Sequence, residues 1–349
     1  MILHILPPNN FTIPFVHFIN KEFDSNEHLF LFNAKPTDDI VSFKNVRFVK
    51  DTSRIKYNII KNIFLYYRSI KRASKIIIHG LPPIKYFILS PGVFKKTYWI
   101  IYGYEIYNRN NDENRNKKIN KLLENFILKR IYGHLTHIKG DSELANQIYK
   151  SSAKFFYTPM YLSNIVATKK TKRSKLPGRT EKLKILVGNS AAPTNNHASI
   201  FKMLLPYRES NILIYCPLSY GNYPEYRDEV IQEGKELFGD KFVPMTNLMK
   251  IEEYNFFLEE IDIAIFNHFR QQAMGVTLTL LSMGKTVFMN SQTTSYKSFI
   301  ERGIKVFDNK LIEREGLFVK RDVLKNPGLV FENYNYEILK SSLALIFND

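Results

Sequence analysis

Short runs of apolar residues alternate along almost the whole chain with longer segments whose apolar residues recur at helical spacing. Runs that are continuous rather than alternating indicate strands covered on both faces, as in the parallel sheets of doubly wound α/β proteins. The pattern therefore predicts an α/β fold. The predicted strands are residues 2–6, 28–34, 46–49, 75–80 and 97–103, followed by 182–190, 212–218, 261–267 and 286–290. The predicted helices are residues 57–73, 224–238, 250–259, 275–283 and 335–347.

A basic segment divides the chain into two halves of similar size. Residues 168–184 carry eight Lys and Arg residues against one Glu, with Pro177 and Gly178 in the middle, which is typical of a solvated linker. A chain of 349 residues also exceeds the usual size of a single hydrophobic core. We therefore expect an N-terminal α/β domain (1–167), a linker (168–182) and a C-terminal α/β domain (183–349), whose last helix could pack back on the first domain.

Charge and cysteine content narrow the setting and the partner. The net charge of +17 favours contact with something anionic, namely nucleic acid, phospholipid headgroups or a phosphorylated substrate. The single cysteine, Cys216, excludes an intrachain disulfide and suits a reducing, cytoplasmic compartment. The N-terminal sequence lacks the features of a signal peptide, and no run reaches the roughly 18 apolar residues of a membrane span. We therefore expect a soluble or peripheral protein.

The common nucleotide-binding and hydrolase motifs are absent. The sequence has no G-x-x-x-x-G-K-[ST], no G-x-G-x-x-G after a strand and no G-x-S-x-G, which argues against P-loop NTPases, standard dinucleotide enzymes and α/β-hydrolases. In open α/β sheets, ligands bind at the carboxyl ends of the strands. Candidate sites are therefore the polar clusters that follow predicted strands.

The first cluster follows strand 182–190, in the sequence GNSAAPTNNH. A glycine followed by small hydrogen-bonding residues lets backbone amides approach an anion closely. The same pattern is typical of a turn capped by Asn and Ser, and the residues alone leave both interpretations open. The members of the cluster are Gly188, Asn189, Ser190, Thr194, Asn195 and His197.

The second cluster follows strand 212–218 and contains an aromatic residue. Its backbone groups and tyrosine could hold a flat nucleobase, although a tight loop with buried aromatics has the same composition. The members of the cluster are Pro217, Ser219, Tyr220 and Gly221.

In the third cluster, an arginine and two glutamines precede the apolar helix predicted at 275–283. The amides and partial positive charge of a helix N-terminus suit a diphosphate, to which Arg270 adds a bidentate donor. An interface or ion-pair arginine is the alternative, but packing and capping explain Gln271 and Gln272 poorly. Gly275 and Thr277 complete the cluster in the first helical turn.

Two strands of the first half also end in unusual groups. Strand 75–80 leaves His79 and Gly80 at its tip, and strand 97–103 leaves Gly103, followed by Glu105. A carboxylate at a strand end is a candidate general base, able to deprotonate a hydroxyl. A carboxylate favoured by the dipole at the start of a helix is the alternative for Glu105.

In order and spacing, these residues resemble one bacterial family. The patterns G-N-S…T-N-x-H at 188–197 and R-Q-Q-x-x-G at 270–275, with H-G at 79–80 and Y-G-Y-E-I-Y at 102–107, are similar to the TDP-4-acetamido-4,6-dideoxygalactose (Fuc4NAc) transferases. These enzymes form glycosyltransferase family 56, also called 4-alpha-L-fucosyltransferases. The resemblance extends across most of the chain and is strong in the second half. The family carries an aspartate at the position of Glu105, so a carboxylate is kept.

The resemblance implies a GT-B fold, in which two Rossmann-like domains face each other across a cleft. The C-terminal half would bind a nucleotide sugar, and the N-terminal half would bind a polyprenyl-diphosphate-linked saccharide at the inner face of the plasma membrane. The resemblance also implies an enzyme without a cofactor or metal ion, so arginine, backbone amides and a helix dipole must neutralise the departing diphosphate. We therefore expect a cytoplasmic, peripheral protein that contacts anionic lipids.

Two apolar and basic segments, 57–75 and 114–133, suit such a membrane surface. Ordinary amphipathic helices that pack on the sheet with their lysines outward have the same pattern, so both interpretations stay open.

Each cluster takes a role from this resemblance. Arg270, the amides around Gly275 and Thr277, and the 188–190 loop are assigned to the diphosphate. Residues 217–221 would hold the base, and Gln271 and Gln272 the sugar hydroxyls or acetamido group. Glu105 would be the base in a direct displacement, a role that it loses if the reaction retains the anomeric configuration.

The expected donor is a TDP-linked 6-deoxy amino sugar, and the expected product is a surface polysaccharide such as enterobacterial common antigen, O-antigen or capsule. A GT-B transferase that uses a UDP- or GDP-sugar is an alternative. A basic nucleic-acid-binding protein is the alternative from another class, but the diffuse charge and the absence of RRM, KH and helix-turn-helix patterns argue against it.

Overall fold

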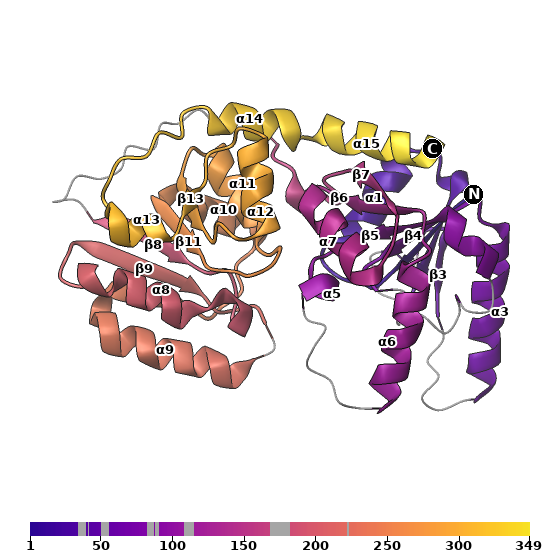
Figure 1. Ribbon diagram of the computed structural model, residues 1–349, viewed down its shortest axis with the longest axis horizontal. Coiled ribbons are helices and arrows are strands. Elements are labelled where there is room, and N and C mark those ends of the chain that lie inside the picture. The colour runs from indigo at the N-terminus through magenta and orange to yellow at the C-terminus, as the bar shows by residue number, and fades with distance from the viewer. Residues whose placement is uncertain are drawn as a thin grey trace. The chain divides into compact units, whose positions relative to one another are not determined.

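The predicted apolar runs form two separate parallel sheets (Figure 1). The computed structural model describes residues 1–33, 40, 42–49, 56–81, 87, 91–107, 115–167, 182–221 and 223–349. Unit 1 comprises Met1–Asn164 together with Tyr336–Asp349, and unit 2 comprises Ile165–Asn335. The predicted linker, residues 168–182, lies outside the described residues except for Lys182.

The sheet of unit 1 has the strand order β3-β2-β1-β4-β5-β6-β7, and every neighbouring pair is parallel. The strands are β1 (Ile2–Leu6), β2 (His28–Phe32), β3 (Val46–Phe48), β4 (Lys75–His79), β5 (Thr97–Ile100), β6 (Gly133–Thr136) and β7 (Lys154–Tyr157). The helices are α1 (Thr12–Glu22), α3 (Lys56–Arg72), α5 (Tyr104–Tyr107), α6 (Arg115–Leu128), α7 (Lys139–Tyr149) and α15 (Tyr336–Asn348). Short 3-10 turns lie at Ser25–Glu27, Pro91–Lys96 and Leu162–Asn164.

The two faces of this sheet pack against different helices. Leu3 and Ile76 belong to an apolar core that includes side chains from α3, α6 and α7. Because side chains alternate across a strand, His4 points to the opposite face. There its ring contacts Phe15 of α1 and Phe347 of α15. The last helix of the chain therefore covers the same face of the sheet as the first helix.

The sheet of unit 2 has the order β10-β9-β8-β11-β12-β13, again with parallel pairs. The strands are β8 (Leu183–Val187), β9 (Ile212–Pro217), β10 (Phe242–Met245), β11 (Ile263–Phe266), β12 (Thr286–Met289) and β13 (Phe307–Asp308). The helices are α8 (His197–Leu204), α9 (Pro224–Phe238), α10 (Ile251–Glu260), α11 (Met274–Ser282), α12 (Thr294–Glu301), α13 (Lys310–Arg314) and α14 (Asn326–Asn333). The 3-10 turns are Pro193–Asn195, Leu205–Tyr207 and Gly239–Lys241.

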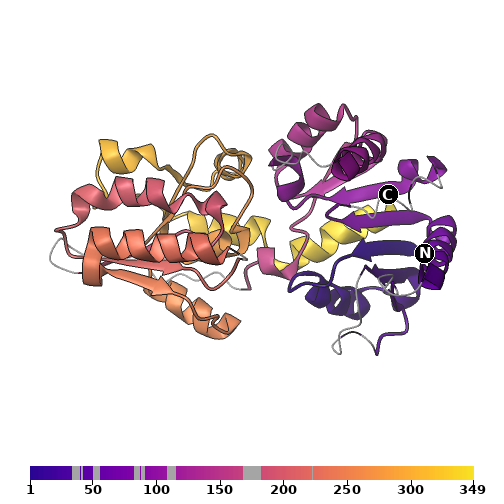
Figure 2. The same ribbon diagram turned by 90° about the horizontal axis from the view of Figure 1, so that it is seen from below.

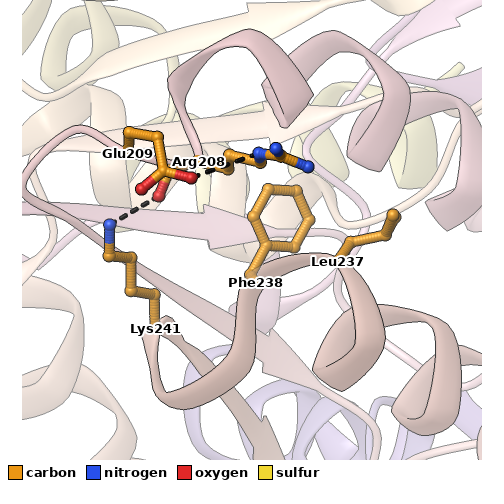
Figure 3. Close-up of a pocket in the computed structure, with 5 residues that line it drawn as sticks. All are labelled: Arg208, Glu209, Leu237, Phe238 and Lys241. Carbon is orange, nitrogen blue, oxygen red and sulfur yellow. Dashed lines mark hydrogen bonds and ion pairs between the residues drawn. The ribbon is translucent and has the colours of Figure 1, made fainter.

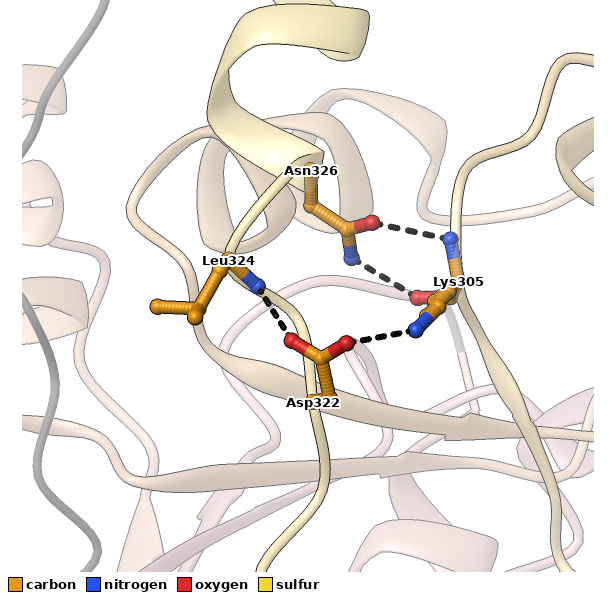
Figure 4. Close-up of polar contacts among 4 residues, drawn as sticks. All are labelled: Lys305, Asp322, Leu324 and Asn326. Carbon is orange, nitrogen blue, oxygen red and sulfur yellow. Dashed lines mark hydrogen bonds and ion pairs between the residues drawn. The ribbon is translucent and has the colours of Figure 1, made fainter.

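Helices α8 and α9 lie on one face of this sheet and α10 to α12 on the other (Figure 1). Helix α14 packs against α11, and polar contacts fix the start of α14 (Figure 4). The Asn326 side chain accepts a hydrogen bond from the Lys305 amide and donates one to its carbonyl, both at 2.8 Å. Lys305 also pairs with Asp322 at 2.7 Å. These contacts hold α14 where it supports α11.

All nine predicted strands are present, most of them a few residues shorter than predicted. The prediction missed the strands β6, β7, β10 and β13 and the helices α1, α7, α8, α12, α13 and α14. In the part of the chain that the structure describes, no helix combines the length and the hydropathy needed to cross a membrane.

Candidate functional site

Strands β8 and β11 are neighbours at the centre of the unit 2 sheet. Strands β9 and β10 extend the sheet to one side of β8, whereas β12 and β13 extend it beyond β11. This reversal of direction is a topological switch point, where the loops after the two strands diverge and ligands of open α/β sheets bind. The 188–197 cluster follows β8, and the 270–277 cluster follows β11. The fold therefore brings the first and third predicted clusters together.

Asn195 organises the loop after β8 from a fully buried position. Its Nδ2 donates to the Ser190 carbonyl at 2.9 Å and to Ser190 Oγ at 3.0 Å. Its Oδ1 accepts from the Asn189 amide at 2.9 Å and lies 2.9 Å from His268 Nε2. Since that oxygen only accepts, His268 carries its proton on Nε2. The loop is thus closed on itself and attached to the end of β11.

Gly188 is required where the loop leaves β8. Its φ is +65°, and a Cβ there would lie 2.7 Å from His197 Nε2 and 2.9 Å from Asn195 Oδ1. His197 Nδ1 bonds Tyr226 Oη at 2.9 Å. Burial lowers the pKa of His197 to about 4. Burial, followed by the charge of Arg270, lowers the pKa of His268 to about 3, so both rings are neutral at pH 7.

Gln272 joins the two loops. Its Nε2 donates to Asn189 Oδ1 at 3.0 Å, and its Oε1 accepts from Thr194 Oγ1 at 2.8 Å. Packing and capping were expected to explain this glutamine poorly. Its hydrogen bonds give it a structural role of another kind, because both ends of its amide hold the loop after β8. Contact between Gln272 and a sugar stays a prediction.

Helix α11 begins at Met274, after Ala273 in the left-handed region with φ 57°, one residue before the predicted start. Gln271 Oε1 and Thr277 Oγ1 are buried and have no hydrogen-bond partner among the residues that the structure describes, and the same holds for His197 Nε2. Arg270 is half-buried, and its Nη1 donates to the Gln271 carbonyl at 3.3 Å. Orphaned polar atoms, an arginine and helix-end amides can together hold an anionic, hydroxyl-rich ligand.

The second predicted cluster adjoins this site. The Ala191 amide donates to the Tyr220 carbonyl at 2.7 Å, and a Cβ at Gly221 would lie 3.2 Å from the Ala191 carbonyl carbon. Pro217 ends β9, and Ser219 lies between it and Tyr220. The Tyr220 side chain is exposed, so the aromatic is not buried in a tight loop and its ring is accessible for stacking.

The groups predicted in the first half meet at the corresponding point of unit 1. Strands β1 and β4 are neighbours, and the strand order reverses between them. Gly80 follows β4 with φ +78°, and a Cβ there would lie 2.8 Å from Tyr102 Cε2 and 3.4 Å from Glu105 Oε1. Gly103, with φ +90°, precedes the short helix α5, which carries Glu105. His79, Gly80, Gly103 and Glu105 are thus brought together, with Glu105 buried rather than exposed at a strand tip.

Sequence reasoning assigned no role to Asn9 and Tyr161 in this region, and Tyr102 was noted only as part of the motif at 102–107. Tyr161 Oη lies 2.6 Å from His79 Nδ1 and 2.7 Å from Tyr102 Oη. Asn9 had a detectable signal, because it follows a predicted strand and precedes an apolar segment, as helix-capping residues do. Tyr161 lies far along the chain from β4 and carried no such signal.

A comparison with known protein families shows which family the chain belongs to. The profile of the 4-alpha-L-fucosyltransferases, glycosyl transferase group 56, matches residues 14–325. The chain belongs to this family. The resemblance inferred from the sequence is confirmed, and this family 56 protein is an enzyme, a hexosyltransferase that uses a nucleotide-sugar donor and an acceptor.

Solved structures agree with the family on the fold. A glycosyltransferase from Rickettsia africae superposes with a TM-score of 0.69 at 14% identity, covering 99% of this chain and 97% of that one. HepE from Anabaena, in complex with UDP and glucose, gives 0.68 at 9% identity and 99% of both chains. The lipopolysaccharide outer core galactosyltransferase WaaB gives 0.67 at 11% identity, covering 100% and 99%. The predicted GT-B fold class is confirmed.

Within the described ranges of the family 56 protein, no group of three or more His, Cys, Asp or Glu side chains is placed to hold a metal ion.

A surface pocket lies away from the candidate site. Its volume is about 290 Å³, and it is lined by Arg208, Glu209, Leu237, Phe238 and Lys241 (Figure 3). It lies at the amino ends of β9 and β10, the edge opposite the carboxyl-end loops. Its lysine already donates to the carbonyls of Arg208 and Ser210.

Proposed function

We propose that this glycosyltransferase moves a 6-deoxy amino sugar, similar to Fuc4NAc, from a TDP-sugar to a polyprenyl-diphosphate-linked saccharide. Such a product would enter a surface polysaccharide such as enterobacterial common antigen, O-antigen or capsule. One observation carries the donor half of the proposal. Three loops predicted to bind a nucleotide sugar converge at the switch point between β8 and β11, with buried polar atoms that lack partners among the described residues. Membership of family 56 supports the choice of sugar.

The donor diphosphate would bind at the N-terminus of α11. The first amides of a helix lack intrahelical partners and carry a partial positive charge. Arg270 adds a charged fork, and the 188–190 loop adds further backbone amides. We propose that these groups replace a metal ion in neutralising the leaving diphosphate, so that transfer persists in EDTA.

We assign the remaining residues to the nucleobase, to the donor sugar and to the removal of the acceptor proton. Tyr220 offers an exposed ring for the nucleobase. Gln271 Oε1 and Thr277 Oγ1 would accept hydrogen bonds from sugar hydroxyls or from an acetamido N–H, while Gln272 positions the loop. Glu105, beside the switch point of unit 1, would take the proton of the acceptor hydroxyl if the reaction inverts the anomeric centre.

A peripheral position on an anionic membrane suits two helices of unit 1. Figures 1 and 2 show α3 and α6 extending in the same direction, lengthwise in the first view and nearly end-on in the second. Helix α3 exposes apolar residues at positions 60, 63, 64 and 67, between exposed lysines and arginines. Helix α6 exposes Leu122 and Phe126. An exposed apolar stripe with basic flanks is typical of a membrane-surface helix.

Thermal shift with TDP, UDP, GDP and a single-stranded oligonucleotide tests the donor. A ligand that binds only the folded state at 100 times its Kd stabilises it by about 2.7 kcal/mol, and we expect the largest shift with TDP. Arg270→Ala should weaken nucleotide binding roughly 10- to 100-fold, because it removes charge-assisted hydrogen bonds worth about 1.5–3 kcal/mol. Arg208→Ala, in the surface pocket, is the matched control and should bind normally.

The outcomes separate the alternatives. A larger shift with UDP or GDP would replace the TDP-sugar, and HepE was solved with UDP. Stabilisation by the oligonucleotide and by no nucleoside diphosphate would refute the donor site. Glu105→Ala should bind nucleotide normally and lose turnover, so normal turnover in that variant would remove Glu105 as the base.

A further inference from the structure

A row of hydrogen-bonded histidine and tyrosine side chains crosses one face of the unit 1 sheet. His28 Nδ1, at the start of β2, lies 3.0 Å from His4 Nε2 on β1. His4 Nδ1 lies 3.4 Å from His79 Nε2, at the end of β4. His79 Nδ1 bonds Tyr161 Oη at 2.6 Å, and Tyr161 Oη bonds Tyr102 Oη at 2.7 Å. The row therefore runs from the amino edge of the sheet to its carboxyl edge.

The three imidazoles of the row are neutral at pH 7. Burial lowers the pKa of His79 to about 3. Burial and then the mutual proximity of the rings lower the pKa of His4 well below its usual value, and burial lowers that of His28 to about 4. A neutral imidazole donates with one nitrogen and accepts with the other. The tautomer of one ring therefore fixes the next, and all three rings must share a tautomer.

Tyr102 is held from a second side by Asn9. Asn9 Oδ1 accepts from the amides of Phe11 and Thr12, each at 2.9 Å, so its Nδ2 faces away from the start of α1. The Asn9 side chain also interacts with Tyr102 in the sense that lowers the tyrosine pKa, as a donor to the hydroxyl oxygen does. The Tyr102 hydroxyl is thus fixed by Asn9 and Tyr161. The Tyr102 residue remains partly exposed at the switch point between β1 and β4.

We propose that Tyr102 contacts the acceptor substrate through its hydroxyl, and that Tyr161 and His79 are positioning residues that hold it there. This inference rests on the proposed function, because it takes the acceptor to bind at the switch point of unit 1. Buried polar groups are less favourable than apolar packing unless they are fully bonded. A row needed only to stabilise the sheet would not have to end at a partly exposed tyrosine that is held from two sides, beside Gly80 and Glu105.

All hydrogen bonds of the row can also reverse their direction together, each donor becoming the acceptor, without the loss of any of them. We call these two directions the two polarities of the row. In one polarity Tyr102 donates to Tyr161 and its oxygen accepts from the ligand. In the other, Tyr161 donates to Tyr102, and the Tyr102 proton points to the ligand. A sugar hydroxyl both donates and accepts, so Tyr102 matches it in both states. This match assigns Tyr102 to a hydroxyl of the acceptor saccharide.

Acceptor kinetics test the proposal, with a farnesyl-diphosphate-linked chitobiose as the probe. Tyr102→Phe keeps the ring and removes the hydroxyl, so kcat/KM for the probe should fall roughly tenfold while KM for the donor stays unchanged. Tyr161→Phe should cause a smaller fall, and adding it to Tyr102→Phe should change little, since Tyr161 acts through Tyr102. Tyr132→Phe is the control, because that hydroxyl lies before β6, at the opposite edge, and accepts from Lys154.

Normal probe kinetics in folded Tyr102→Phe would overturn the contact, and a fully additive loss in the double variant would overturn the positioning role. A donor other than a TDP-sugar would refute the proposed donor only, and the same variants are then measured with that donor.

Histidine ¹⁵N NMR tests the row itself and needs no turnover. It should show one shared tautomer for His4, His28 and His79, and a His79 shift on adding the probe that Tyr161→Phe abolishes. Mixed tautomers, or no shift in the wild type, would refute the row or its contact with the acceptor.

Discussion

A methyl group added at Gly188 would meet His197 Nε2 at 2.7 Å and Asn195 Oδ1 at 2.9 Å, on a backbone with φ +65°. Both neighbours are buried and already oriented by other hydrogen bonds, so neither can move freely. We expect Gly188→Ala to destabilise the protein by about 1–3 kcal/mol and to weaken donor binding at least tenfold. Urea denaturation and nucleotide titration measure the two effects.

Gly239→Ala is the matched control for this substitution. Gly239 also has a positive φ, +54°, but a Cβ there meets nothing within 4 Å. Its cost should be limited to backbone strain of about 1–3 kcal/mol, because ψ is −129°, and nucleotide binding should stay normal. Equal effects of the two substitutions on binding would contradict the packing of His197 and Asn195 around Gly188.

The sequence predicted which segments the fold would bring together better than it predicted how their side chains interact. Gly188 and Asn195 were predicted because a glycine followed by small polar residues after a strand lets backbone amides approach an anion, although a capped turn has the same pattern. Gln272 was assigned to a sugar, although it joins two loops, because spacing along the chain cannot show that Thr194 comes within 2.8 Å of it. The His4–His79–Tyr161 contacts were missed for the same reason, since they join residues from three separate parts of the sequence.

At the level of elements, α3 presents apolar residues where a sheet-packed helix would present lysines. Ile60 is 66% exposed and Phe64 60% exposed, one helical turn apart. If this stripe enters an anionic bilayer surface, replacing both residues with Gln should weaken binding to phosphatidylglycerol vesicles roughly tenfold or more. Co-sedimentation with vesicles of phosphatidylglycerol and phosphatidylcholine, at low and high salt, measures the effect.

Phe256→Gln provides the comparison for these variants, because Phe256 is a 75% exposed aromatic on α10 of unit 2. It should leave vesicle binding unchanged. Wild-type protein that does not sediment with anionic vesicles, or that loses binding equally with Phe256→Gln, would rule out α3 as the membrane contact.

Strands that consist almost entirely of apolar residues could be predicted from the sequence, whereas strands with polar residues or proline could not. Strand β1 is five apolar or histidine residues in a row and was predicted to the residue. Strand β6, GHLT, is fully buried yet half polar, because His134 bonds Ser142 at 3.0 Å inside the fold. Strand β10 contains Pro244, which counts against a strand in sequence reasoning. Tertiary contacts therefore decided the strands that the pattern did not reveal.

For the whole molecule, buried histidines make stability depend on acidity. Six rings, those of His4, His28, His79, His134, His197 and His268, have pKa values lowered chiefly by burial. Below about pH 6.5 the unfolded chain binds protons that the folded chain does not, so stability is complete above that pH and falls toward the folded values of about 3 to 4. Each ring with a folded pKa of about 3 to 4 should contribute about 2 kcal/mol of this loss by pH 5.

Urea denaturation at pH 7.5 and pH 5.0 checks this expectation, and the midpoint should fall markedly at the lower pH. His134→Gln should reduce by about one the number of protons that the protein takes up on unfolding, so stability should depend less on pH. His17→Gln, at an exposed position, should leave the pH dependence of stability as in the wild type. The same midpoint at both values of pH would show that the rings are not buried and neutral in solution.

The C-terminal helix gives the chain a topology that matters for dissecting the protein. Unit 1 is built from two segments, Met1–Asn164 and Tyr336–Asp349, with unit 2 between them. No single cut therefore separates the units, and a truncation after residue 335 would strip Phe347 from His4 and His28. Residues 165–335 form an insert within unit 1. A chimera that exchanges donor specificity with a relative should therefore replace this insert and keep both flanking segments.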